Sequence, residues 1–122
     1  MIKVKSVYER PKPDDGYRIL VDLFWPEGVK TRMAQLDDWY KELGPSYDLE
    51  RFHFNTNHWE EYKQAYLKEV LNSKEKKQLL EKIAEKAKNG QVTLVYGHKD
   101  PDHNHAVILK EYIEKNYLTG EG

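Results

Sequence analysis

The stretch QVTLVYGHKDPDHNHAVILKEYI, residues 91–113, decides the fold of this 122-residue chain. Its first six residues form a short apolar and β-branched run that ends at Gly97, which is typical of a buried strand. The next eight residues are almost wholly polar, and from Ala106 onward apolar residues recur at helical spacing. The stretch therefore predicts a strand, a polar loop and a helix. Because ligands gather at such strand-to-helix loops in open α/β sheets, we expect a site here.

Composition indicates a small protein with one domain and no disulfide framework. The 122 residues are enough to bury roughly two thirds of the unfolded surface. A net charge of −1 argues against general binding to nucleic acid or to an anionic membrane. No apolar run approaches the roughly 18 residues of a membrane span, and the N-terminus lacks a signal-peptide pattern. The absence of cysteine excludes a thiol nucleophile and a thiolate metal site. We therefore expect a cytoplasmic protein.

Two further strands are predicted before the middle of the chain. Residues 2–8 alternate between apolar and polar side chains, and lysines on one face favour an edge strand. Residues 10–16 hold two prolines and a terminal Asp-Gly, which predicts a turn and an antiparallel pairing of the first two strands. The second strand, residues 17–24, is nearly continuous in apolar character, as expected for a central strand.

Helical patterns occupy the centre of the chain. A short helix is expected over residues 36–43, a second from Ser46 to Phe52, a third after Asn57 and a fourth from Ser73. The helical spacing of four aromatic residues predicts that they belong to the core: Trp39, Trp59, Tyr62 and Tyr66.

The order of these elements predicts an α/β fold. A strand, then helices, then another strand form a crossover that makes the second and third strands parallel. We expect a single small domain over residues 1–118, with a three- to four-stranded mixed sheet and helices packed on it. Residues 119–122 are expected to form a flexible C-terminal tail.

Polar residues cluster where the predicted strands end. If the second and third strands are neighbours, their C-terminal ends coincide, and the start of the last helix reaches the same place. These ends carry Asp22, Trp25, Tyr96, His98, Lys99 and His105. The sequence therefore predicts a polar pocket at the C-terminal ends of the strands.

His105 and Asp22 are the candidate catalytic residues. With Asp102 as N-cap, His105 lies in the first helical turn, where the helix dipole disfavours an imidazolium. A neutral imidazole suits a general base, and Asp22 would orient it. In the alternative interpretation, His105 and Asn104 bond loop carbonyls and join the loop to the strand.

The other polar residues suggest ligand contacts. Lys99, close to free N–H groups at a helix start, suits an anion, although Asp100 and Asp102 oppose its charge. Arg18 is either a second anion ligand or half of an ion pair at the strand start. His98 could join His105 and Asp22 at a metal ion, although no established metal-ligand spacing is present. In the alternative, the loop histidines cap the helix or face solvent.

Four motifs resemble the YeaO-like branch of the domain-of-unknown-function 488 family. They are GYRILVD-x-x-WP-x-G at 16–28, D-x-W-x-K-x-L-x-PS-x-x-L at 37–49, WEEY-x-x-x-Y at 59–66 and VTLVY-x-x-KD-x-x-HNHAVIL at 92–109. The resemblance implies a compact cytoplasmic α/β domain and no established activity. It places the family's polar positions on Arg18, Asp22, Trp25, Tyr96, Lys99, Asn104 and His105. Family members typically carry arginine at positions 23, 27 and 50 and a small residue at 98. The absence of these arginines weakens a phosphate-binding interpretation.

Three functions are compatible with this sequence. The first is an enzyme acting on a small polar or anionic substrate, with Asp22 and His105 as an acid–base pair. The second is a non-catalytic module that binds a small ligand or a partner protein, and the third is a His/Asp metal-binding protein. A concave polar pocket would favour the first, a flat exposed aromatic patch the second and bound metal in the purified protein the third. The sequence does not identify a cofactor or an oligomeric state.

Overall fold

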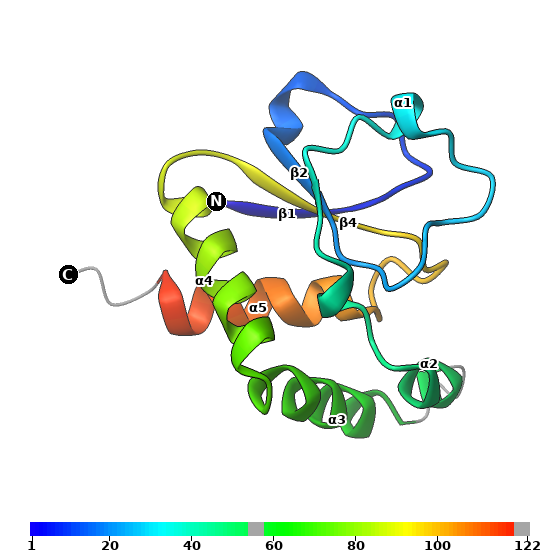
Figure 1. The fold of residues 1–122 in the computed structure, drawn as a ribbon, viewed down its shortest axis with the longest axis vertical. Helices are drawn as coiled ribbons and strands as arrows, with labels where there is room; N and C mark the ends of the chain where they lie inside the picture. Colours follow the sequence, from blue (N-terminus) through cyan, green and yellow to red (C-terminus); the bar gives the residue numbers. More distant parts are fainter. Residues whose placement is uncertain (54–57, 119–122) are drawn as a thin grey trace.

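The computed structural model describes residues 1–53 and 58–118 (Figure 1). The tail expected at 119–122 and the helix cap expected at Asn57 lie outside these residues. Among the described residues, no helix combines the length and the apolar character that crossing a membrane requires.

Four parallel strands form the sheet, in the order β1-β4-β2-β3. Their bounds are Ile2–Ser6 for β1, Tyr17–Leu20 for β2, Asp38–Trp39 for β3 and Val92–Tyr96 for β4. Strands β2 and β4 lie side by side at the centre, with Tyr17 opposite Val92 and Leu20 opposite Val95. This confirms the predicted α/β class and the predicted parallel pairing of the two central strands.

The expected antiparallel pairing of the first two strands is wrong. Strand β1 pairs with β4 instead, in parallel, with Ile2 opposite Val92. The turn predicted over 10–16 is part of a longer connection that contains a short 3-10 helix, η1, at Pro13–Asp15. Since both edges of β4 are available, β1 and β2 each pair with it, and the described sheet is parallel throughout rather than mixed.

Three long helices cover one face of the sheet (Figure 1). They are α3 at Trp59–Leu71, α4 at Lys74–Lys88 and α5 at His105–Tyr117, while the shorter α2 spans Tyr47–His53. Alternate residues of β4, namely Val92, Leu94 and Tyr96, enter the core beneath these helices. Tyr62 and Tyr66 are buried there, as predicted. Helix α4 begins after Ser73, where a helix start was predicted, and Ser73 caps it by accepting a hydrogen bond from the Lys76 backbone.

The opposite face of the sheet is covered by loops and by α1, at Thr31–Ala34 (Figure 1). A smaller apolar cluster lies there, built from Val7, Leu20, Ala34 and Val95. Partly buried Trp25 and Leu36 pack against this cluster. The loop after β2 therefore serves as a third layer.

Two element predictions are corrected by the structure. Strand β2 ends at Leu20 rather than at Phe24, so Asp22 follows the strand instead of lying within it. The helix expected over 36–43 is replaced by β3 and by a 3-10 helix, η2, at Lys41–Leu43. Trp39 on this edge strand is 37% exposed, so its expected place in the core is wrong.

Candidate functional site

Asp22 lies at the C-terminal end of β2, beside the end of β4. Val21 still donates its backbone N–H to Val95 O over 3.0 Å, and the chain leaves the sheet after it. The carboxylate of Asp22 then accepts a hydrogen bond at Oδ2 from Gly97 N, 2.8 Å away. A Cβ at Gly97 would also lie 2.8 Å from that oxygen, so only glycine permits this approach. The predicted convergence of the two strand ends is confirmed.

His105 reaches the same place as the first residue of α5. The N-cap is Asn104 rather than Asp102: Asn104 Oδ1 accepts from Val107 N, and its Nδ2 donates to Asp100 O. Both Asn104 and His105 are buried. The cap thus orients the start of α5 toward the end of β2.

The His105 ring is held between two acceptors. Its Nε2 lies 2.9 Å from Val21 O and 3.0 Å from Asp22 Oδ1. A carbonyl oxygen only accepts, so Nε2 carries a hydrogen and donates it to Val21. Asp22 Oδ1 is buried and lies within ion-pair distance of the ring. It accepts no hydrogen bond of suitable geometry from a described residue. The ring also packs edge-on to Tyr66, with centroids 5.8 Å apart.

A cavity of about 270 Å³ opens beside Asp22. Its lining defines the Glu50 pocket: Asp22, Leu23, Phe24, Pro45, Tyr47 and Glu50. Helix α2 reaches this position because Gly44 packs directly on the preceding loop, where a Cβ would lie 2.1 Å from Leu23 N. Ser46 then caps the helix by accepting from Leu49 N, as predicted.

Glu50 is the ionisable member of this pocket that the sequence did not predict, and of the six lining residues only Asp22 was predicted as a site residue. Burial raises the pKa of its carboxyl, and nearby Asp22 raises it further while His105 lowers it. Its side chain makes no hydrogen bond or ion pair with a described residue. The sequence signal that could have found it is Gly44-Pro45, which turns the helix that carries Glu50 back onto the loop after β2.

The polar loop after β4 supplies the remaining neighbours. Tyr96 is buried, and burial raises the pKa of its hydroxyl. His98 Nδ1 accepts from Asp100 N over 3.0 Å, and burial together with His105 lowers the pKa of its imidazole. Lys99 is exposed, and its ammonium contacts no described partner. Most of the described hydrogen bonds of this loop are made within the loop itself. This agrees with the alternative interpretation, in which Asn104 bonds a loop carbonyl.

Trp25 and Arg18 do not join Asp22. The Trp25 indole donates to Val29 O and lies edge-on to Trp39, with centroids 5.5 Å apart. Trp39 contacts the site instead, donating from Nε1 to Asp22 O over 2.7 Å. This aromatic residue was expected in the core, and it lies at the rim of the site.

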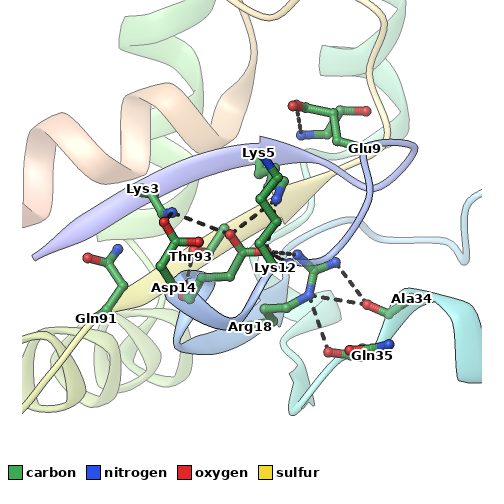
Figure 2. Close-up of polar contacts among 12 residues, drawn as sticks. Lys3, Lys5, Glu9, Lys12, Asp14, Arg18, Ala34, Gln35, Gln91 and Thr93 are labelled. Carbon is green, nitrogen blue, oxygen red and sulfur yellow. Dashed lines mark hydrogen bonds and ion pairs between the residues drawn. The ribbon is translucent and has the colours of Figure 1, made fainter.

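Arg18 belongs to a separate buried network on the loop-covered face (Figure 2). Its guanidinium lies 2.7 Å from Asp15 Oδ2 and donates to the carbonyls of Ala34 and Gln35. Lys5 and Lys3 also pair with Asp15, which is fully buried. Burial alone would raise the pKa of this carboxyl, but the Lys12 backbone N–H and the three cations lower it well below its usual value. Of the two roles considered for Arg18, an anion ligand or half of an ion pair, the structure shows the ion pair.

The metal interpretation lacks a ligand set in this structure. Among residues 1–50 and 58–118, whose side chains the structure describes, no three His, Asp or Glu side chains are grouped to hold a metal ion. His105 already directs its Nε2 hydrogen to Val21 O, whereas a metal ligand needs a free lone pair there.

Comparison with known proteins shows similarity along nearly the whole chain. The sequence profile described as the inactive DUF488-N3 subclade matches residues 1–121. The uncharacterized protein YeaO of Escherichia coli strain K12 is 35% identical over 113 residues, covering 92% of this chain and 96% of YeaO. The uncharacterized proteins Rv3073c of Mycobacterium tuberculosis H37Rv and Mb3100c of Mycobacterium bovis are each 29% identical, with 92% of both chains covered. No solved structure matches.

Proposed function

Because this chain belongs to the DUF488 family, in the subclade described as inactive, we propose that it is a cytoplasmic binding module without catalytic activity. The Glu50 pocket and the exposed side chains around it are the proposed binding surface. In this proposal the Asp22–His105 pair holds the surface in place and does not react.

The observation that carries the proposal is the position of His105 Nε2. A general base needs a lone pair directed at the substrate, and here the same nitrogen donates to Val21 O. His105 is only 2% exposed, so substrate has no direct access to the ring. Asp22 in turn receives the Gly97 N–H and contacts the ring edge, which suits a brace between β2, β4 and α5.

The surface around the pocket supports binding rather than chemistry. Phe24 is 72% exposed and Tyr47 69% exposed, and both line the Glu50 pocket. Soluble proteins seldom expose contiguous aromatic side chains unless a ligand or partner covers them. A flat exposed aromatic patch was the feature expected of a binding module, and here the exposed aromatic rings line a cavity.

The state of His105 provides the first test. Long-range ¹H–¹⁵N spectra of labelled protein identify which ring nitrogen carries the hydrogen in the neutral imidazole. We expect Nε2–H, as a brace to Val21 requires. A neutral ring protonated at Nδ1, with Nε2 free, would instead favour the acid–base pair, for which the 3.0 Å contact with Asp22 is the supporting observation.

A ligand titration tests the binding surface itself. Amide resonances of ¹⁵N-labelled protein would be followed during addition of small apolar, cationic and anionic compounds. We expect the largest shifts at the backbone amides of Leu23, Phe24, Tyr47 and Glu50. Shifts concentrated elsewhere, for instance along the exposed residues of α4, would contradict the proposal.

A further inference from the structure

The Glu50 pocket gathers much of the exposed apolar surface. Among the described residues, seven large apolar side chains are exposed: Met1, Tyr8, Leu23, Phe24, Met33, Trp39 and Tyr47. Three of them, Leu23, Phe24 and Tyr47, line this one pocket, and Trp39 bonds the backbone of Asp22 beside it. The concentration of aromatic and aliphatic side chains around one concave site is typical of a protein contact.

The charged side chains that line the pocket are both acidic. They are Glu50 and Asp22, and Asp22 already has His105 as an ion-pair neighbour. The Glu50 carboxylate is half-buried and makes no ion pair or hydrogen bond with any residue whose side chain the structure describes, which are residues 1–50 and 58–118. Partial desolvation of an unpaired carboxylate is costly, and a cation brought by a partner would remove that cost.

We propose that the Glu50 pocket receives an arginine side chain of a partner protein. The guanidinium pairs with Glu50, while apolar residues next to the arginine cover Phe24 and Tyr47. This inference rests on the proposed binding function and assigns the class of partner to it.

Arginine fits this lining better than lysine for three reasons. Its planar guanidinium pairs with a carboxylate through two parallel hydrogen bonds. It also stacks on aromatic rings, and Phe24 is an aromatic residue of this lining. Finally, it is more weakly hydrated than an ammonium group, so it enters a partly apolar pocket at lower desolvation cost.

The exposure of the rim favours a protein over a free small molecule. Phe24 and Tyr47 are each more than two-thirds exposed, although both line the cavity. A small cation that fills about 270 Å³ would leave most of these two rings in water. A protein segment on both sides of the arginine would cover them, as the rim of a protein interface covers its central contact.

The test uses short peptides of known composition. Acetyl-leucyl-arginyl-phenylalaninamide would be titrated into the ¹⁵N-labelled full chain, alongside versions with citrulline or lysine in place of arginine. We expect saturating shifts around the Glu50 pocket with a dissociation constant of about 1 mM or lower for the arginine peptide. Citrulline keeps the shape of arginine but lacks its charge. The citrulline peptide should therefore bind at least about tenfold more weakly than the arginine peptide.

Matched variants assign the effect to the pocket. Glu50→Gln should weaken the arginine peptide about tenfold and leave the citrulline peptide almost unchanged. Asp48→Asn is the control, because Asp48 is exposed on the same helix and does not line the pocket. Its binding curve should match that of the unmodified chain.

The possible outcomes separate the inference from the function on which it rests. Equal binding of the arginine and citrulline peptides at the pocket would overturn the cationic partner and leave a binding surface. Binding of N-ethylguanidinium as tight as that of the peptide would overturn the protein partner in favour of a free small cation. No shift at the pocket with any peptide, together with none from the small compounds, would overturn both proposals.

Discussion

His105 Nε2 lies 3.0 Å from Asp22 Oδ1 while donating its hydrogen to Val21 O, so one imidazole holds both the backbone and the side chain at the end of β2. Asp22 is also tied to Gly97 after β4. Three elements distant in sequence therefore meet through these two side chains.

A double-mutant cycle should reveal this coupling. We expect Asp22→Asn and His105→Ala each to lower the free energy of unfolding by about 1–3 kcal/mol, with a combined loss smaller than the sum. His105→Gln, which keeps a donor for Val21 O, should lose less than His105→Ala. Urea denaturation would measure the free energy of unfolding of the four chains of the cycle and of His105→Gln. Full additivity of the two losses would contradict a coupling between Asp22 and His105.

Gly97→Ala should disturb the same brace from the other side. The added Cβ would lie 2.8 Å from Asp22 Oδ2, so the carboxylate has to move, at an expected cost of about 1–3 kcal/mol. Gly90→Ala is the control, because a Cβ there meets nothing within 4 Å. In an Asp22→Ala background the clash disappears, and the cost of Gly97→Ala measured by urea denaturation should fall. An unchanged cost would locate the strain elsewhere.

Asp15→Asn should be the most destabilising of the polar substitutions. It leaves Arg18, Lys5 and Lys3 without their shared carboxylate, at an expected cost of roughly 3–5 kcal/mol for breaking a buried ion pair. Thermal unfolding at pH 7 measures the loss. Asp14→Asn provides the comparison, since Asp14 is exposed and pairs with Lys3 over 3.7 Å, and it should be nearly neutral.

The contribution of Asp15 should also depend on pH in a defined direction. Its pKa is lowered in the folded chain from an ordinary value of 3.8. The stability that it provides is therefore fully present above that ordinary value and is lost as pH falls toward the folded pKa. The urea midpoint would be measured for the native chain and for Asp15→Asn at intervals of about one pH unit. The difference between the two midpoints should shrink as the pH falls from about 5 to about 2. A constant difference would contradict the lowered pKa.

Glu50→Gln should act in the opposite direction. The pKa of Glu50 is raised above its ordinary value of 4.5, so the folded state favours the protonated carboxyl. Its effect on stability therefore becomes unfavourable as pH rises from that ordinary value through the folded pKa. We expect Glu50→Gln to stabilise the chain by roughly 0.5–1 kcal/mol at pH 7 and to have no effect below about pH 4. Urea midpoints at the two pH values check this, and destabilisation at pH 7 would show that Glu50 serves the fold.

The parallel pairing of β2 and β4 could be predicted from the sequence because both strands are continuous apolar runs and the segment between them contains helices. That pattern allows few alternatives, and it placed Asp22 and His105 together. The pairing of β1 was misread because residues 10–16 look like a tight turn, and local turn chemistry does not reveal that β4 offers a second free edge. Two-residue β3 is too short to leave a periodic signal.

The parts of the site that were missed depend on tertiary contacts. Asp15 looked like a turn residue, and its burial follows from cations on β1 and β2 that only the folded sheet assembles around it. Position 50 was noted only as one where family members carry arginine, and the partial burial of Glu50 follows from the contact between Gly44 and Leu23. Arg18 was considered as an anion ligand, but β2 ends before Asp22, and the Arg18 guanidinium pairs with Asp15 instead.

The position of β1 at the edge of the sheet has a consequence for how the chain folds. Its only described partner strand is β4, so residues 2–6 pair with residues 92–96, which lie far away in the sequence. Such a pairing forms slowly, because a long loop has to close before its contacts form. During synthesis, β1 emerges long before its partner and keeps both backbone edges unpaired. Its lysines at positions 3 and 5, which later pair with Asp15, would at that stage protect the nascent strand from association with other chains.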